Sequence, residues 1–259
     1  MGRMTVIPGT SAITLSGAPK ITMTDWERQI AALPGLRHVI DPAKLDSVGN
    51  GRDRFNGALI TSKNPGVTTK AEANAQFNNL PTITFADKTG GLLLPKGTVT
   101  KSVSFIAAAL LSPENSGSCN LLTSFIETAY QFSFRVNDLQ TLRFYSDNSD
   151  TVSNTIVSPN FPAPGTAGIW AFSFDADTMQ SANLFKNSSG QAQLLIRSHT
   201  VAPTATELSR WAFGGSAGTL GWLGSMGMGL IFDRALHMPT LEPFFWKAIQ
   251  LMKTKYGIA

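Results

Sequence analysis

Short apolar segments recur along most of this chain, at intervals of about 10 to 15 residues. Glycine, proline, asparagine or serine separates them, and these residues favour turns. Residues 131–136 alternate apolar and polar positions with a period of two, whereas residues 103–111 form a continuous apolar run. A strand with one buried face alternates in this way, and a continuous run is consistent with burial on both faces. The pattern predicts an all-β fold, a two-sheet antiparallel sandwich.

The expected strands are spread over most of the chain. Between residues 42 and 79 the sequence is polar and weakly patterned, and Gly49-Asn50-Gly51 and Asn64-Pro65-Gly66 are strong turn signals. We therefore expect irregular surface loops there. The strands are expected at residues 37–41, 77–85, 92–94, 103–111, 121–125, 131–136, 141–145, 169–175, 182–187, 194–196, 210–215 and 221–232.

Helices are expected only near the two ends. Thr24 can cap a short helix over residues 24–33, and Glu27, three residues later, completes a capping box. A second, amphipathic helix is expected to open at Pro239 and Thr240 and to end at Gly257. The segment before residue 25 is rich in Thr, Ser, Gly and Pro, and we interpret it as an extended arm.

The closing part of the chain carries a family resemblance. A glycine-punctuated apolar strand, Gly221–Phe232, leads into Asp233-Arg234-Ala235-Leu236, and the last helix ends Lys255-Tyr256-Gly257-Ile258. This order resembles the end of laminin G-like, concanavalin A-like jelly rolls, especially those of phage structural proteins. The resemblance extends over residues 36–259 and implies one jelly-roll domain there. Residues 1–35 would form the N-terminal arm and the short helix.

The composition excludes several classes of protein. Hydrophobic residues make up 42% of the chain, which excludes disorder throughout. The 21 Lys and Arg residues exceed the 17 Asp and Glu residues by only four and do not cluster, so we expect no nucleic-acid partner. No apolar run is long enough for membrane insertion, and no signal peptide is recognisable. The single cysteine, Cys119, lies in a loop-like context and excludes an internal disulfide.

The residues needed for catalysis are missing from the sequence. Hydrolysis of a glycoside needs two converging carboxylates, and the glutamates of this chain are dispersed. No Gly-x-Ser-x-Gly elbow stands between a strand and a helix. The three histidines, His38, His199 and His237, are isolated in sequence, and we expect them at the surface or as caps. We therefore expect no enzyme and no catalytic residue.

Oxygen-rich loops are the candidates for a metal site. Some laminin G-like jelly rolls hold calcium through loop carboxylates and carbonyls, and Asp147 and Asp150 offer such ligands. Asp175 and Asp177 follow a strand and offer more, although a plain turn role is the alternative for both. Calcium is the only cofactor that we consider.

Tyr145 is the aromatic residue best placed to bind a glycan. An aromatic ring that is exposed beside polar groups can stack on a sugar, and Tyr145 adjoins the polar loop of residues 146–154. Trp170, Trp211 and Trp222 lie within strand patterns instead, so we expect them in the core.

The resemblance implies a function for the whole chain. We expect a non-enzymatic bacteriophage virion structural protein on the particle surface, in capsid decoration or in a tail, baseplate or fibre. We expect its arm to contact other virion proteins, including further copies of itself in a homo-oligomer. Assembly would take place in the host cytoplasm. The alternative is a carbohydrate-binding module that recognises host surface glycans, and a third hypothesis is an unusual glycan hydrolase.

Overall fold

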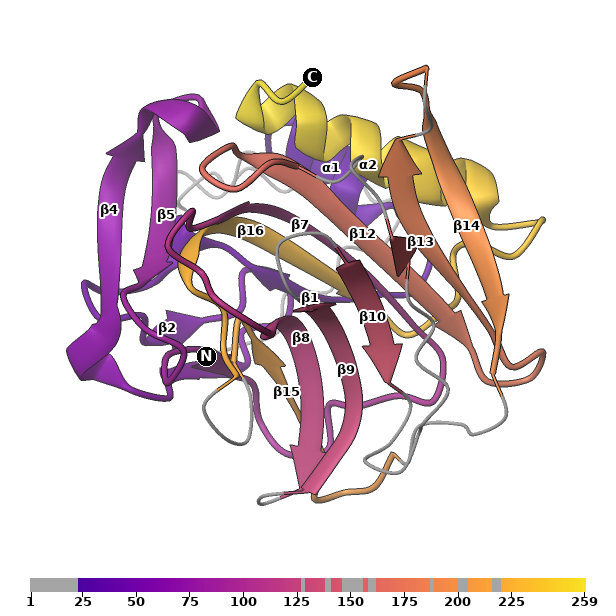
Figure 1. Ribbon diagram of the computed structural model, residues 1–259, viewed down its shortest axis with the longest axis horizontal. Coiled ribbons are helices and arrows are strands. Elements are labelled where there is room, and N and C mark those ends of the chain that lie inside the picture. The colour runs from indigo at the N-terminus through magenta and orange to yellow at the C-terminus, as the bar shows by residue number, and fades with distance from the viewer. Residues whose placement is uncertain are drawn as a thin grey trace, which may run out of the picture.

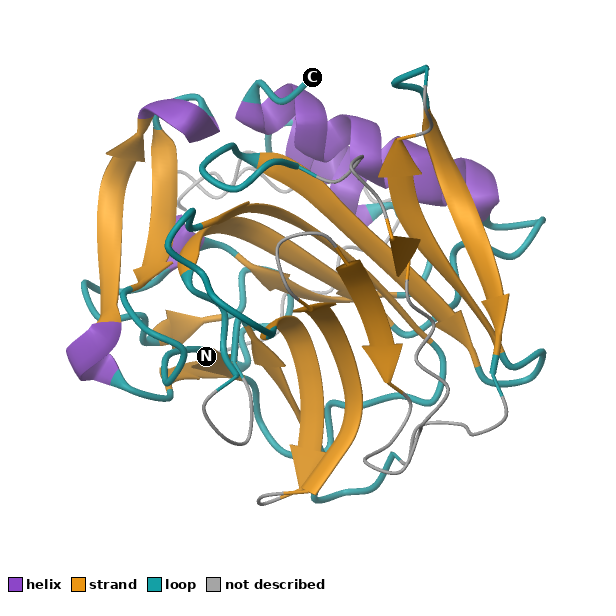
Figure 2. Cartoon of the chain, in the orientation of Figure 1, coloured by secondary structure: helices purple, strands orange, loops and turns teal. Residues whose placement is uncertain are grey.

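The computed structural model describes residues 23–126, 129–137, 141–145, 156–157, 162–186, 189–199, 205–215 and 220–259. Two β-sheets pack face to face, and two helices lie against the outer face of one of them (Figure 1, Figure 2). The strand pairs of the described residues are antiparallel. The all-β sandwich predicted from the sequence is therefore confirmed. The predicted arm lies outside the described residues except for its last positions.

We call the helix-covered sheet sheet 1 and the other sheet 2. In sheet 1 the order is β14 (Ala192–Ser198), β13 (Gln180–Lys186), β12 (Gly168–Asp175), β7 (Val103–Leu111), β16 (Gly224–Phe232), β5 (Leu80–Phe85) and β4 (Thr68–Asn74), and β1 (Leu36–Ile40) also pairs with β16. In sheet 2 the order is β11 (Ile156–Val157), β10 (Thr141–Tyr145), β9 (Ala129–Asn137), β8 (Cys119–Ile126), β15 (Arg210–Phe213), β6 (Leu92–Leu93), β3 (Leu59–Ser62) and β2 (Gly51–Arg52).

The prediction of irregular loops over residues 42–79 is wrong. Strands β2, β3 and β4 lie in this stretch, and β4 forms an edge of sheet 1. Of the β4 side chains only Thr68 is fully buried, so the strand lacks the apolar alternation that would have indicated it. Short 3-10 turns connect these strands at Pro42–Lys44, Pro65–Val67 and Ala75–Phe77.

The central strands of sheet 1, β7, β12 and β16, are buried on both faces, which explains their continuous apolar sequences. On β7, Phe105, Ala107 and Ala109 belong to the core between the sheets. The alternating residues Ile106 and Ala108 belong to a second core beneath the helices. Period-two alternation thus sends every second side chain of one strand into a different core.

Strand β16 explains the glycines of the closing segment. A side chain at Gly229 would lie 2.4 Å from the Phe213 ring, and one at Gly227 would lie 2.8 Å from the Tyr256 ring. The pairing with β7 shifts between Met226 and Gly229, which is a β-bulge. At this bulge the Met228 N–H donates a hydrogen bond of 2.6 Å to the Tyr256 hydroxyl.

Helix α2 (Glu242–Tyr256) lies across the outer face of sheet 1. It starts two residues after the predicted Thr240, because Pro243 occupies the first turn, where a missing N–H costs no hydrogen bond. Gly257 ends the helix as predicted, with a left-handed φ of 62°.

Helix α1 (Asp25–Ala31) begins at the predicted cap. Thr24 and Glu27 form the reciprocal capping box. Trp26 fixes α1 to α2, because its Nε1 donates to the Leu251 carbonyl at 2.9 Å and Lys255 Nζ lies 4.2 Å from its ring centroid. Arg54 bridges Glu27 and Asp41 through two ion pairs.

Neither helix of the described chain has the length and apolar character to traverse a bilayer.

We predict that Tyr256→Phe lowers the free energy of unfolding by about 1–3 kcal/mol, because it leaves the buried Met228 N–H without a partner. The phenyl ring keeps the edge contact with Phe77, whose ring centroid is 5.8 Å away. Urea denaturation measures the change. An unchanged midpoint would show that this hydrogen bond does not stabilise the bulge.

We predict that Glu27→Gln weakens the acid sensitivity of folding. Hydrogen bonds from the Thr24 backbone and side chain, and then from Arg54, lower the pKa of Glu27 from 4.5 to about 2. Because the folded pKa lies below the unfolded one, this stabilisation is complete above pH 4.5 and is lost as the pH falls toward about 2.

Urea denaturation across this pH window checks the prediction, with Glu72→Gln as the control for loss of an exposed carboxylate. The difference in stability between wild type and Glu27→Gln should shrink as the pH falls. A difference that does not depend on pH would contradict it.

Candidate functional site

The structure describes two of the four predicted calcium ligands, Asp175 and Asp177. Asp175 is 8% exposed, and its Oδ2 accepts hydrogen bonds from the Thr178 N–H and hydroxyl at 2.8 and 2.7 Å. Burial pushes the pKa of Asp175 upward, but the bonds from Thr178 and Ser102 outweigh it and hold that pKa below its usual value. Asp177 is exposed, and Asp147 and Asp150 lie outside the described residues.

Among the described residues, no group of three or more His, Cys, Asp or Glu side chains could hold a metal ion. Asp175 Oδ2 closes the turn after β12, and Asp175 Oδ1 accepts the Ser102 hydroxyl at 3.3 Å. The calcium site therefore stays a prediction. The contacts of Asp175 fit the alternative, a plain turn role.

Tyr145 is the last residue of β10 and pairs with Ser133 of β9. Its side chain is outside the described structure. Ser133 alternates with the core residue Phe134, which places Ser133 on the outer face of sheet 2. There the Asn120 Oδ1 accepts hydrogen bonds from the Ser133 hydroxyl at 2.6 Å and from the Arg135 Nε at 3.1 Å. Asn120 and Ser133 are both buried.

Two predictions about exposure are wrong. His38, His199 and His237 are 5%, 7% and 6% exposed rather than at the surface, because each is hydrogen-bonded to a partner distant in sequence. Cys119 opens β8 instead of lying in a loop, and burial raises the pKa of its thiol to about 12. Such a thiol is protonated near neutral pH and is a poor nucleophile. The core positions predicted for Trp170, Trp211 and Trp222 are confirmed.

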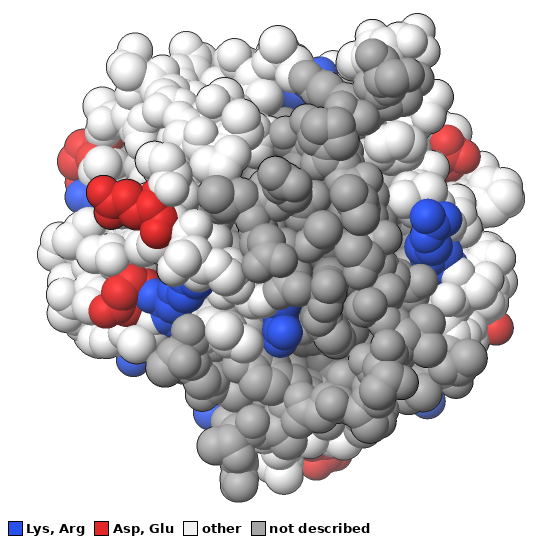
Figure 3. All heavy atoms as spheres, in the orientation of Figure 1, with Lys and Arg blue, Asp and Glu red and all other residues white. Residues whose placement is uncertain are grey.

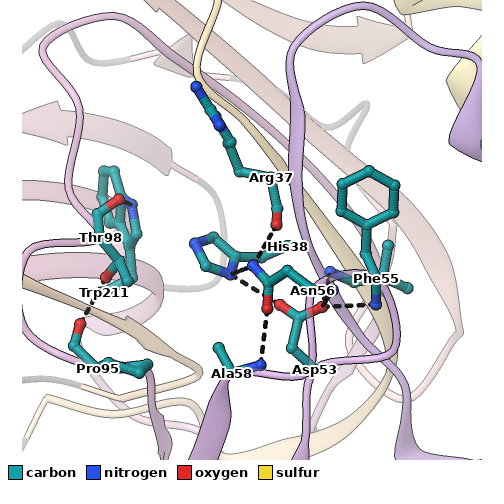
Figure 4. Close-up of polar contacts among 10 residues, drawn as sticks. Arg37, His38, Asp53, Phe55, Asn56, Ala58, Pro95, Thr98 and Trp211 are labelled. Carbon is teal, nitrogen blue, oxygen red and sulfur yellow. Dashed lines mark hydrogen bonds and ion pairs between the residues drawn. The ribbon is translucent and has the colours of Figure 1, made fainter. Parts of the chain in front are cut away.

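His38 and Asp53 form a buried imidazole–carboxylate pair (Figure 4). The His38 Nδ1 lies 2.7 Å from Asp53 Oδ2, and Asn56 Nδ2 lies 3.1 Å from the same nitrogen. Asp53 Oδ1 accepts the backbone N–H groups of Val39, Phe55 and Asn56.

Hydrolytic triads use an imidazole–carboxylate pair to activate a hydroxyl or thiol. Among the described residues, no such group is hydrogen-bonded to His38. Three backbone bonds on one carboxylate oxygen instead fasten the turn after β2 to strand β1. We therefore assign the pair a structural role.

A groove of about 670 Å³ opens between the β13–β14 pair and the beginning of α2. These elements stand side by side in Figure 1, where the orange β14 lies beside the yellow helix. The volume is within the range of small-molecule sites. The groove is lined by Gln180, Ala192, Gln193, Leu194, Ile196, His237, Met238, Pro239, Glu242 and Trp246.

Helix α2 supplies the aromatic surface of the groove. Trp246 is half-buried, and its Nε1 donates a 2.9 Å hydrogen bond to Glu242 Oε1, one helical turn earlier. This bond fixes the orientation of both side chains. A partly exposed indole beside a carboxylate and two glutamine amides offers an apolar surface with planar polar groups around it.

His237 also lines the groove and is hydrogen-bonded to Ser173 of strand β12. Its Nδ1 lies 2.7 Å from the Ser173 hydroxyl, which in turn lies 2.8 Å from the Ser104 hydroxyl. The Nε2 atom is buried and has no hydrogen-bond partner among the described residues. Burial lowers the pKa of His237, against the opposite pull of Asp175 and Glu242.

A second crevice, of about 460 Å³, lies between the start of β12 and the end of α2. Its walls are mostly apolar, including Ile169, Leu184 and Ile258. The first groove combines an aromatic ring with convergent polar groups, so we consider it the candidate site.

The sequence contained one signal for the groove that sequence reasoning missed. Glu242 and Trp246 are four residues apart, which places them on the same face of a helix. The rest of the groove comes from β13 and β14, whose approach to α2 the sequence does not reveal.

On the face drawn in Figure 3, acidic and basic residues are interspersed among uncharged ones.

Comparisons with solved structures confirm the fold. Domain 4 of AbnA, an extracellular family 43 arabinanase from Geobacillus stearothermophilus solved with arabinotriose, matches with a TM-score of 0.58 at 13% identity, over 81% of this chain and 98% of that domain. Trypanosoma rangeli sialidase with sialic acid matches with a TM-score of 0.54 at 12% identity, over 86% of this chain. Identities this low establish a common fold alone.

This chain covers only 37% of that sialidase. No protein-family model and no curated protein sequence matches the chain. The similar structures are thus β-sandwich domains of carbohydrate-active proteins, and none of those named concerns a phage particle.

We predict that Asp53→Ala lowers the free energy of unfolding by about 2–4 kcal/mol, because it removes the acceptor of several buried donors at once. Thermal and urea denaturation measure the loss. Ligand binding in the groove should survive wherever the variant is folded. A variant as stable as wild type would overturn the structural role of the pair.

Proposed function

We propose that this chain is a non-enzymatic carbohydrate-binding module that holds a glycan in the groove between β14 and α2. The observation that carries the proposal is the composition of that groove: Trp246 presents an indole beside Glu242, Gln180 and Gln193. Sugars combine apolar C–H faces with hydroxyl groups that both donate and accept hydrogen bonds. An aromatic ring among planar polar side chains complements both features.

The similar structures favour this proposal over a virion structural role. The arabinanase domain, which corresponds over almost its whole length to this chain, was solved with arabinotriose. The phage interpretation rests on the sequence resemblance alone. Attachment to a particle, the homo-oligomer and the contacts of the arm remain predictions, and a receptor-recognition module would combine a glycan site with any of them.

The lack of catalysis is part of the proposal. Glycoside hydrolysis needs two carboxyl groups on opposite sides of the scissile bond. Among the described residues that line the groove, Glu242 is the only carboxylate, and it already accepts the Trp246 N–H. We therefore expect binding without release of reducing ends from polysaccharides.

We predict that Trp246→Ala weakens glycan binding at least about tenfold, because the loss of a stacked aromatic surface removes on the order of 1.4 kcal/mol or more of binding free energy. A glycan array screens for ligands, and titration calorimetry measures the affinity of those found. Phe244→Ala is the matched control, since Phe244 is a 38% exposed aromatic residue on the same helix that does not line the groove.

Tyr145→Ala discriminates the groove from the site predicted on β10. Binding that is lost in Tyr145→Ala but retained in Trp246→Ala would place the glycan on sheet 2 and contradict the groove. An array on which no glycan is bound by the folded protein would contradict the function itself.

A further inference from the structure

We infer that the groove selects neutral, hydroxyl-rich glycans and rejects glycans that carry a carboxylate. The inference rests on the proposed glycan-binding function and concerns the ligand class of the same groove. It follows from the number and direction of the hydrogen atoms that the groove can offer, together with its charge.

The hydroxyl groups of Ser104 and Ser173 determine where the proton on His237 lies. The Ser104 hydroxyl donates its single hydrogen to the Arg234 carbonyl at 2.7 Å and accepts the Leu236 N–H. Ser104 therefore has no hydrogen left for Ser173, so the Ser173 hydroxyl must donate across the 2.8 Å contact to Ser104.

The same count of hydrogen atoms determines which nitrogen of His237 carries the proton. With its own hydrogen used, Ser173 can only accept from His237, so the proton lies on His237 Nδ1. Burial lowers the pKa of His237 and favours the neutral ring. The neutral ring with a protonated Nδ1 carries a lone pair on Nε2, and that atom has no partner among the described residues.

His237 thus presents an acceptor that lacks a donor. The residue is 6% exposed, so bulk water has little access to it, and a buried acceptor without a partner is unfavourable. Because this nitrogen has less than 1 Å² of accessible surface, a ligand hydroxyl can donate to it only when the side chains that cover it move aside. An ionised carboxylate cannot, because it has no hydrogen to donate.

The charge of the groove favours the same ligand class. Glu242 contributes a carboxylate, which Trp246 holds in place at 2.9 Å. None of the lining residues is Lys or Arg. A second carboxylate brought by a ligand would lie near Glu242 without a cation to offset the repulsion. The amides of Gln180 and Gln193 can donate to or accept from hydroxyl groups.

Matched pairs of trisaccharides test the inference. Galactotriose and trigalacturonic acid have the same length and ring stereochemistry but differ in the C6 carboxylate, and glucose and mannose trimers can be paired with their uronic acids in the same way. Titration calorimetry should give the neutral member of any bound pair an affinity at least about tenfold higher. Glu242→Gln, which keeps an oxygen that can accept the Trp246 N–H, should narrow that ratio severalfold.

The outcomes separate this inference from the proposed function. If the uronic acids bind as tightly as the neutral trimers or more tightly, and Trp246→Ala abolishes that binding, the inferred selectivity is wrong. The proposed glycan-binding groove is then supported. Binding of a trimer that Trp246→Ala leaves unchanged would remove the groove as the site and the inference with it.

Nuclear magnetic resonance provides a test that needs no ligand. Long-range ¹⁵N–¹H correlation spectra, assigned with His237→Gln, should show His237 protonated on Nδ1 and unprotonated on Nε2 at neutral pH. A ring protonated on Nε2, or on both nitrogens, would overturn the inference, because Nε2 would then be a donor suited to a carboxylate.

Discussion

A bulge in strand β16 fixes the C-terminal end of helix α2 on sheet 1. The bulge after Met226 turns the Met228 N–H out of the strand ladder, and the Tyr256 hydroxyl accepts it. Gly227 leaves the room that the tyrosine ring needs. Because Tyr256 is the last residue of α2, this contact anchors the end of the helix on the sheet. Phe245, Ala248, Ile249 and Met252 bury the rest of α2 in the same core, up to the groove at its beginning.

Features encoded by neighbouring residues could be predicted from the sequence. The capping box of Thr24 and Glu27, the end of α2 at Gly257 and the buried strand β7 each follow from a few adjacent positions, and the structure has all three. Edge strand β4 escaped prediction because it buries little apolar surface. The histidines escaped because their partners are remote: His38 and Asp53 are 15 positions apart, and His237 and Ser173 are 64 apart.

The candidate site shows the same contrast between features encoded by neighbouring residues and features made by distant ones. Tyr145 was predicted from its neighbours, whereas the groove joins β13, β14 and α2, which meet only in the folded chain. In the sequence, Trp246 cannot be distinguished from any other aromatic residue of an amphipathic helix. Only in the folded chain is it half-buried beside the adjacent strands. The orphaned nitrogen of His237 depends on three successive hydrogen bonds from three separate segments, which no local pattern encodes.

The candidate groove lies at the margin of sheet 1, away from the two cores on which folding depends. Its strand wall is β14, a border strand with mostly solvent-facing side chains, whereas the two cores lie under β7, β12 and β16. Residues such as Gln193 and Ile196 can therefore be exchanged without opening a cavity in either core. Under the proposed function, substitutions along this rim would change which sugar is bound while the sandwich beneath it stays the same.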